Sequence, residues 1–216
     1  MVFRRVILIC LFICITAGSW AFDFTPVRLR YEGGDWYNDE NALTILAGYV
    51  NEHTPLKMDT SEIVLSMDNR RIMDYPFLFM TGHGGFDYTQ SELENIRAYV
   101  LAGGFVYIDD DYGFNTDIMN FLDELFPARS TVKLSPDSDI LNAFYKLDRL
   151  PKIHEHYDGE PEMYGIFIGE KIGVLYTFNS NISDGWAVYE THNDPLEKRI
   201  EALKTGVNII YYALFK

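Results

Sequence analysis

The chain has 216 residues, and its 32 Asp and Glu outnumber its 18 Lys and Arg, which gives a formal net charge of −14. This acidic balance argues against binding to nucleic acid and to anionic membrane surfaces, because both attract basic patches. Residues 1–21 have the pattern of a secretory signal peptide, with Arg4 and Arg5 before an apolar run over 6–15 and a small residue, Ala21, at the cleavage position. We therefore expect an exported protein, periplasmic or extracellular.

The predicted cleavage removes 21 of the 216 residues and leaves one domain over 22–216, which is long enough to bury an ordinary hydrophobic core. Both cysteines, Cys10 and Cys14, lie in the predicted signal. The domain therefore has no disulfide, no thiol nucleophile and no Cys-ligated zinc site. The apolar run is shorter than the about 20 residues that span a bilayer. The alternative to cleavage is that the segment remains attached and anchors the protein in the membrane.

Short β-rich runs alternate with helical runs in the remaining sequence, a pattern typical of a parallel sheet flanked by helices. The first half predicts strands over 24–31, 63–65, 76–80 and 105–108, and helices over 39–53, with Asp39 as the cap, and 89–102, with a capping box. The second half predicts a helix over 116–126, a strand over 131–134, a helix over 140–145, a hairpin over 165–178 and a helix over 195–214. We therefore predict an α/β fold with a mainly parallel sheet, a late β-hairpin and a C-terminal helix.

Polar motifs follow three of the predicted strands. Residues 35–39 follow the first strand, His83 follows the third, and an aspartate triplet over 109–111 follows the fourth. In an open α/β sheet the ligand crevice lies outside the carboxyl ends of the strands. We therefore expect these motifs to line one edge of the sheet.

His83 and the aspartate triplet each have two interpretations. Glycines on both sides of His83, including Gly84, allow its backbone to approach a ligand closely, and the alternative is a glycine turn with an exposed histidine. Asp109, Asp110 and Asp111 are a candidate cation site, because three carboxylates at a strand end repel one another unless a positive charge compensates. The alternative is that one caps the following helix, one pairs with an arginine and one is solvated.

Three later histidines also lie in polar loops. His154 and His156 are two residues apart, so in an extended segment both imidazoles point the same way, which suits two ligands of one transition metal. His192 precedes the predicted C-terminal helix, either as a ligand or catalyst or as a loop histidine beside a capping residue. His53 lies at a helix end, where we expect it to interact with the helix dipole.

Aromatic residues in predicted loops are candidates for stacking on a sugar or another ligand, or for covering the edge of the core. They include Trp36, Tyr37, Tyr112 and Trp186. The sequence has no nucleophile elbow, no phosphate loop, no dinucleotide fingerprint and no H-E-x-x-H helix.

Separated motifs run through almost the whole domain. They are RLRYEGGDWY at 28–37, YPF at 75–77, TGHG at 81–84, GGF at 103–105, DD at 109–110, KIHEH at 152–156 and GVNI at 206–209. Together they resemble the bacterial family called domain of unknown function 4159. The resemblance is specific for the family and implies no particular biochemical role.

A wider resemblance concerns the fold. A strand ending in Thr-Gly, a helix that begins Thr-x-Ser-Glu-Leu and closes on Gly-Gly-Phe, a further strand and a late hairpin resemble the class I glutamine amidotransferase-like fold, including its trehalose-utilisation-type branch. The resemblance implies a flavodoxin-like three-layer sandwich. In the amidotransferases a cysteine nucleophile occupies the turn that corresponds to 109–111. No cysteine stands there in this sequence, so glutamine hydrolysis through a thiolate is excluded.

Two functions follow as hypotheses, and whether the protein is an enzyme stays open between them. The first is a cell-envelope module that binds a small molecule or a partner protein through Asp35, Trp36, Tyr37, His83, Gly84, Asp109, Asp110, Tyr112 and Trp186. The second is a metal-dependent hydrolase in which zinc or another divalent ion is held by His83, Asp109, Asp110, His154 and His156. Its catalytic groups would be Asp110, His83 and His192.

A bound divalent ion lowers the pKa of its water to about 7 and so replaces the missing thiol. A weaker variant of the hydrolase uses no metal, with Asp110 as nucleophile or base and His83 as acid. The metal hypothesis requires the site side chains to converge within about 5 Å of one point, because metal–ligand bonds are about 2 Å long.

Overall fold

The computed structural model describes residues 23–216. The signal peptide predicted for 1–21 lies outside the described residues. The strands of the main sheet are β2 (Val27–Arg30), β3 (Glu32–Gly34), β5 (Ile63–Ser66), β6 (Phe77–Asp87), β7 (Phe105–Tyr112), β8 (Val132–Lys133), β9 (Glu162–Ile168) and β10 (Lys171–Phe178). Their order is β5-β2-β6-β7-β10-β9-β8, with β3 pairing beside β6.

Five neighbouring strands, β5, β2, β6, β7 and β10, run parallel. The hairpin strand β9 is antiparallel to β10, and β8 is antiparallel to β9. Counted along the chain, the parallel strands lie in the order second, first, third, fourth, fifth, which is the flavodoxin-like order. The predicted α/β fold with a mainly parallel sheet and a late hairpin is confirmed. In this order ligands bind at the carboxyl ends of the strands, where β2 and β6 lie side by side.

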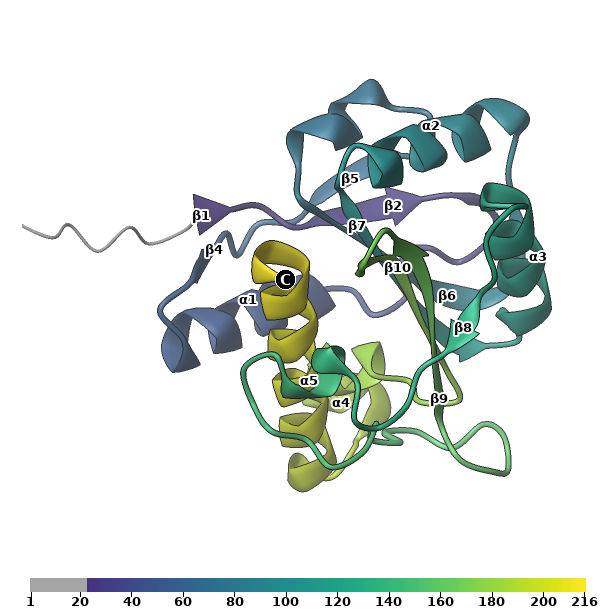
Figure 1. The fold of residues 1–216 in the computed structure, drawn as a ribbon. Helices are drawn as coiled ribbons and strands as arrows, with labels where there is room; N and C mark the ends of the chain where they lie inside the picture. The colour runs from purple at the N-terminus through teal and green to yellow at the C-terminus, as the bar shows by residue number, and fades with distance from the viewer. Residues whose placement is uncertain (1–22) are drawn as a thin grey trace, which may run out of the picture.

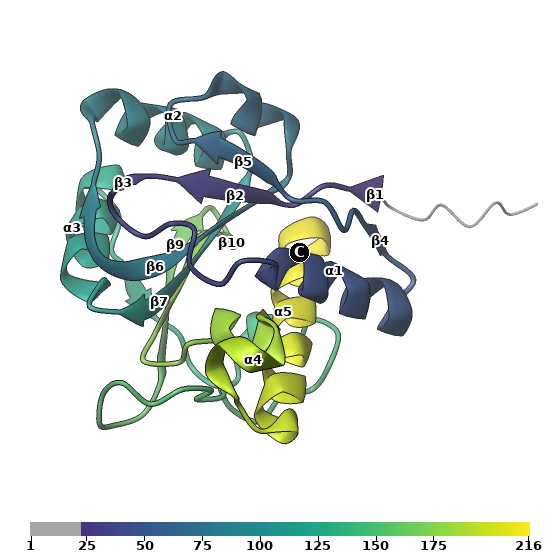
Figure 2. The same ribbon diagram turned by 180° about the vertical axis from the view of Figure 1, so that it is seen from behind.

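Helices cover both faces of the sheet (Figures 1 and 2). Helices α1 (Ala42–His53) and α5 (Leu196–Phe215) pack on one face, and α2 (Gln90–Leu101) and α3 (Asn115–Leu125) pack on the other. The sandwich therefore has three layers. Within the described residues, no helix is both long enough and apolar enough to cross a bilayer.

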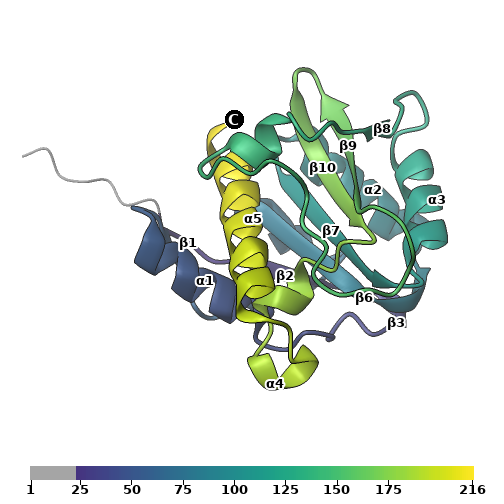
Figure 3. The same ribbon diagram turned by 90° about the horizontal axis from the view of Figure 1, so that it is seen from below.

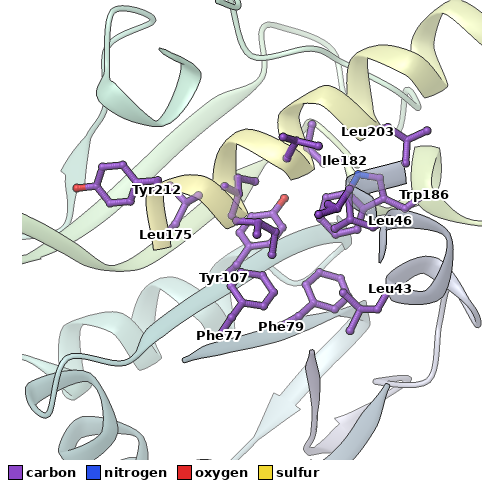
Figure 4. Close-up of a cluster of buried hydrophobic side chains, with 14 of the residues drawn as sticks. Leu43, Leu46, Phe77, Phe79, Tyr107, Leu175, Ile182, Trp186, Leu203 and Tyr212 are labelled. Carbon is purple, nitrogen blue, oxygen red and sulfur yellow. The ribbon is translucent and has the colours of Figure 1, made fainter. Parts of the chain in front are cut away.

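The core is divided into two halves by the alternation of side chains along the strands. Phe77, Phe79 and Tyr107 point to the side that carries α1 and α5 (Figure 4), whereas Leu78 and Val106 belong to the cluster under α2 and α3. All five side chains are buried. At about 25 cal/mol for each Å² of apolar surface removed from water, such side chains contribute roughly 1.5–3 kcal/mol each.

Local signals at helix ends are confirmed in two places and wrong in one. The Thr89 hydroxyl accepts from the backbone N–H of Glu92 at 3.3 Å, and the Glu92 carboxylate accepts from the backbone N–H of Thr89 at 2.8 Å, which completes the predicted capping box. Pro195 precedes α5 as predicted. Asp39 does not cap α1, because its carboxylate is paired with His192 and the helix begins three residues later, at Ala42.

Two predicted strands have different lengths in the structure. Strand β6 does not turn at the glycines around His83 but continues to Asp87, because β3 pairs with it antiparallel. A Cβ on Gly34 would lie 2.5 Å from the carbonyl oxygen of Gly85, so the glycines permit this close pairing of the two strands. Strand β7 likewise extends through the aspartate triplet to Tyr112.

The remaining differences are short. The predicted strand over 24–31 is divided into β1 (Asp23–Phe24), which pairs with β4 (Lys57–Met58), and β2. The helix predicted over 140–145 is a 3₁₀ turn, η2 (Asp139–Asn142), and another 3₁₀ turn, η1 (Arg70–Asp74), precedes β6. The loop after β10 contains the 3₁₀ turn η3 (Ser183–Trp186) and the four-residue helix α4 (Tyr189–His192).

Candidate metal centre

Histidines and aspartates from separate segments meet beyond the carboxyl ends of the parallel strands. Strands β6 and β7 carry His83 and Asp111, and the loop before β9 carries His154 and His156. The segment after β10 carries Asp184 in η3, His192 at the end of α4, and Asp194 before α5. Figure 3 shows α4 beside the N-terminal end of α5. The topology thus brings side chains as far apart in sequence as His83 and Asp194, 111 positions, to one edge of the sheet.

His83 lies between two carboxylates. Its Nδ1 is 3.0 Å from Asp35 Oδ2, and its backbone N–H also donates to the Asp35 carboxylate. Its Nε2 is 3.1 Å from Asp111 Oδ2. The second oxygen of Asp111 lies 3.7 Å from His156 Nε2. His83, Asp111 and His156 therefore form a group, and each offers one ligand atom within 4.8 Å of the others.

Two asparagines hold Asp111 in place. Asn181 Nδ2 donates to Asp111 Oδ1 at 2.9 Å and to the Asp111 carbonyl at 2.7 Å, and the Asn38 amide donates to Asp111 Oδ2. Asp111 is 1% exposed. Burial, followed by the negative charge of Asp39, raises the pKa of Asp111 to about 6.

A second set of groups is built around Asp184. His192 Nε2 is 2.7 Å from Asp39 Oδ1, and His192 Nδ1 is 3.7 Å from Asp184 Oδ2. His154 Nδ1 is 3.6 Å from Asp194 Oδ1. Asp184 belongs to two groups of possible ligands, one with Asp39 and His192 and one with His154 and Asp194.

Asp184 is the least compensated group of this centre. It is 1% exposed, no N–H or hydroxyl group donates to either of its carboxylate oxygens, and the group within hydrogen-bonding reach of it is another carboxyl, that of Asp111. One oxygen each of the buried Asp39 and Asp194 also lacks a partner. Burial, and then the charges of Asp111 and the neighbouring aspartates, raise the pKa of Asp184 to about 11. A bound cation would satisfy such acceptors, because buried polar groups are costly unless they are paired.

The four histidines that the sequence analysis named as candidates lie close to one another, in two neighbouring groups of possible ligands. The ring centroids of His154 and His156 are 4.7 Å apart, those of His83 and His156 are 6.3 Å apart, and those of His154 and His192 are 6.1 Å apart. His154 faces Asp194 and His156 faces Asp111, so the two do not converge on one carboxylate.

Asp109 and Asp110 lie outside these groups. Asp109 accepts from the Thr177 hydroxyl at 2.5 Å and from the backbone N–H and hydroxyl of Ser183 at 2.6 and 2.9 Å, so it joins β7 to β10 and η3. Asp110 Oδ1 accepts from the backbone N–H of Phe114 at 3.0 Å, at the start of α3. Burial raises the pKa of Asp109 to about 7 and that of Asp110 to about 6. The structure therefore places Asp111, the third member of the triplet, with the histidines.

The predicted aromatic ligand residues divide into buried and exposed ones. Of the two interpretations of the loop aromatics, Trp186 has the one in which the ring covers the core and not the one in which it stacks on a ligand: its ring is buried among side chains of α1 and α5 (Figure 4), and its Nε1 donates to the Ala202 carbonyl at 2.9 Å. Trp36 is half-buried against the core under α2 and α3. Tyr37 and Tyr112 are 64% and 46% exposed, and the Tyr112 ring lies 4.8 Å from that of His156.

Sequence reasoning did not name three carboxylates of the centre as metal ligands: Asp39, Asp184 and Asp194. Asp39 was interpreted as a helix cap. The loop that holds the other two leaves the carboxyl end of β10, and this position at a strand exit was a signal for them.

The order of the strands and the polar centre at their carboxyl ends define a flavodoxin-like α/β protein with a histidine–aspartate site. The chain belongs to the family described as Domain of unknown function (DUF4159), whose model matches residues 25–214. This confirms the family predicted from the sequence motifs. A search among curated proteins found no match.

Proposed function

We propose that this protein is a metal-dependent hydrolase that holds a divalent transition metal at Asp184. The observation that carries the proposal is the Asp184 carboxylate itself, which is buried, faces His192 and receives no hydrogen bond from an N–H or hydroxyl group. Imidazole and carboxylate donors together suit zinc and neighbouring transition metals. The ligands that we assign to this first ion are Asp184, His192, His154 and Asp194.

The distances between these groups support shared coordination. Nitrogen and oxygen are 3.7 Å apart between His192 and Asp184, and 3.6 Å apart between His154 and Asp194. Both distances exceed the usual length of a hydrogen bond, which is about 3 Å. Two ligands bound at about 2 Å to one tetrahedral ion lie about 3.3 Å apart. A small inward movement would therefore bring the two members of each pair to this separation.

Asp39 fits the role of an orienting carboxylate. It accepts at 2.7 Å from Nε2 of His192, which leaves Nδ1 of that ring directed toward Asp184. Metal-bound histidines usually donate their other nitrogen to such a carboxylate, which fixes the tautomer and the direction of the ring. The other carboxylate oxygen of Asp39 has no hydrogen-bond partner.

The metal would supply the chemistry that the missing cysteine cannot. A zinc-bound water has a pKa of about 7, so a hydroxide nucleophile is available at neutral pH. His154 is 38% exposed in its side chain, so this side of the centre is open to solvent and to a substrate. The roles that the sequence suggested change accordingly: His192 becomes a ligand, and Asp110 takes part in the start of α3.

The second candidate is a module that binds a small molecule or an envelope protein without catalysis. The exposed rings of Tyr37 and Tyr112 at the same edge of the sheet favour it, because exposed aromatic rings are suited to stacking. The export predicted from residues 1–21 places either function in the cell envelope.

Metal analysis of the natively purified protein tests the proposal. We expect stoichiometric zinc or a related metal, its loss on treatment with EDTA, and metal-dependent hydrolysis of at least one member of a panel of chromogenic carboxylic esters, phosphate esters and peptides. Asp184→Asn should lose the metal. Asp123→Asn, an exposed aspartate on α3, and His53→Gln, a histidine at the end of α1, should retain it.

Two results would contradict the proposal in different ways. A protein that holds no metal, and whose melting temperature EDTA and added zinc leave unchanged, has no metal centre. A protein that holds stoichiometric metal but hydrolyses no member of the panel favours the binding module.

A further inference from the structure

We infer that a second divalent metal ion binds beside the first, held by His83, Asp111 and His156, so that the site is a two-metal centre. The inference deepens the proposed function and rests on it, because the second ion would act together with the ion at Asp184. The ligand class is the same: a divalent transition metal that accepts imidazole and carboxylate donors.

The His83 ring lies between two carboxylates. Its Nδ1 is 3.0 Å from Asp35 Oδ2, and its Nε2 is 3.1 Å from Asp111 Oδ2. Two ligands bound at about 2 Å to one tetrahedral ion lie about 3.3 Å apart, so Nε2 and Asp111 Oδ2 already have the spacing of neighbouring ligands. Asp35 would then orient the ring as its second partner.

Asp111 is fixed in a position between His83 and His156. Its carboxylate is buried and held by Asn38 and Asn181, so it cannot turn away from the histidines without losing these bonds. One oxygen faces His83 Nε2, and the other faces His156 Nε2 at 3.7 Å. Three donors from β6, β7 and the loop before β9 thus surround one point, and two of them are imidazole nitrogens.

The two sites are neighbours. The rings of His154, in the first site, and His156, in the second, have centroids 4.7 Å apart. Neighbouring ions are the arrangement with which two-metal hydrolases stabilise both the attacking and the leaving oxygen.

Both sites have buried carboxylates and at least one exposed histidine. The side chains of His83 and His156 are 37% and 27% exposed, and that of His154 in the first site is 38% exposed, whereas Asp111 and Asp184 are buried. Both ions would therefore be reached from solvent through their histidine ligands.

Titration of the metal-free protein with Co²⁺, followed by equilibrium dialysis and by visible absorption, tests the inference. We expect two ions for each chain. His83→Gln and His156→Gln should each bind one ion, with the affinity of the first site unchanged. His53→Gln serves as the matched histidine control and should bind two.

The outcomes separate this inference from the proposed function. If the unaltered protein binds one ion and His83→Gln and His156→Gln bind it equally well, the second site is refuted while the first stands. If no ion binds, both proposals fail. If circular dichroism shows that the histidine variants do not fold, Asp35→Asn replaces them, because its side chain is 31% exposed.

Asp35→Asn should weaken only the second ion, by about 10- to 100-fold, as expected for loss of an orienting carboxylate. Unchanged affinity for both ions in a folded Asp35→Asn variant would overturn the inference. Nitrogen-15 NMR gives an independent reading: a doubly protonated His83 ring at pH 8 in excess Zn²⁺ would show that a proton, and not a metal, lies between His83 and Asp111.

Discussion

Asp109 and Asp184 are both buried aspartates at the same edge of the sheet, and they differ in the hydrogen bonds that their carboxylates accept. Asp109 accepts hydrogen bonds on both oxygens from Thr177 and Ser183, whereas Asp184 accepts none. The pKa of Asp109 is raised to about 7 and that of Asp184 to about 11, in both cases chiefly by burial. The difference indicates two roles. Asp109 connects the segments that form the edge, and Asp184 remains available to a ligand.

The largest expected effect on stability comes from substitution of Asp109, whose carboxylate is fully hydrogen-bonded. Asp109→Ala leaves the backbone N–H of Ser183 and two hydroxyls without their acceptor in a buried place, so it should lower the free energy of unfolding by about 3–5 kcal/mol. Urea denaturation in EDTA measures this without interference from metal. A loss below about 1 kcal/mol would show that Asp109 is not structural.

Metal binding should produce the next largest effect. Free Zn²⁺ at 100 times its dissociation constant should stabilise the protein by about 2.7 kcal/mol. For a domain of this size the melting temperature should rise by roughly 5–10 °C. The rise should be smaller in Asp184→Asn, which keeps only the ligands of the second ion, and should keep its full size in Asp123→Asn. Differential scanning calorimetry measures both. An equal rise in Asp184→Asn would place the metal elsewhere.

Asp184→Asn should have the opposite sign from Asp109→Ala in metal-free protein. The substitution keeps the shape of the side chain and replaces a buried carboxyl group that must take up a proton on folding with a neutral amide, so at pH 8 it should raise the free energy of unfolding by about 1–3 kcal/mol. Urea denaturation in EDTA provides the measurement. Destabilisation of the same size as in Asp109→Ala would abolish the distinction between the two aspartates.

The smallest effect is a difference in pH dependence. The folded pKa of Asp184, about 11, lies above the value of about 3.8 for an exposed aspartate, so between these values the folded state holds one more proton there than the unfolded state does. Stability from this group is therefore lost as pH rises, by about 1.4 kcal/mol for each pH unit. Asp109 and His192, whose pKa values are also raised, act in the same direction, and His156, with a lowered pKa, opposes them.

Metal-free protein should therefore lose stability between pH 6 and pH 8. In Asp184→Asn the free energy of unfolding should fall less steeply with pH, because this variant lacks the proton that Asp184 binds on folding. Denaturation series at several pH values in EDTA measure the two slopes. Equal slopes would mean that Asp184 is ionised in the folded, metal-free protein. Saturating Zn²⁺ should reduce the loss in the unaltered protein, because metal ligands bind better when they are deprotonated.

Several features follow from the sequence alone because their causes are local. Alternating β-rich and helical runs predict the parallel sheet and its hairpin, and Thr89 and Glu92 predict a helix start within four residues. The site histidines His83, His154, His156 and His192 could also be named, because each stands among glycines or polar residues in a segment outside the core pattern.

The roles of individual carboxylates and of Trp186 depended on contacts between distant segments. In the aspartate triplet the alternation of side chains along β7 sends neighbours to opposite faces, but only the packed sheet decides which face carries the site. Asp39 is drawn away from its helix by His192, which lies 153 positions later. Trp186 is buried because α5 packs over η3. The sequence determined which elements form and which polar residues stand at their ends. Tertiary structure alone decided which carboxylates are hydrogen-bonded, because their donors come from other strands and loops.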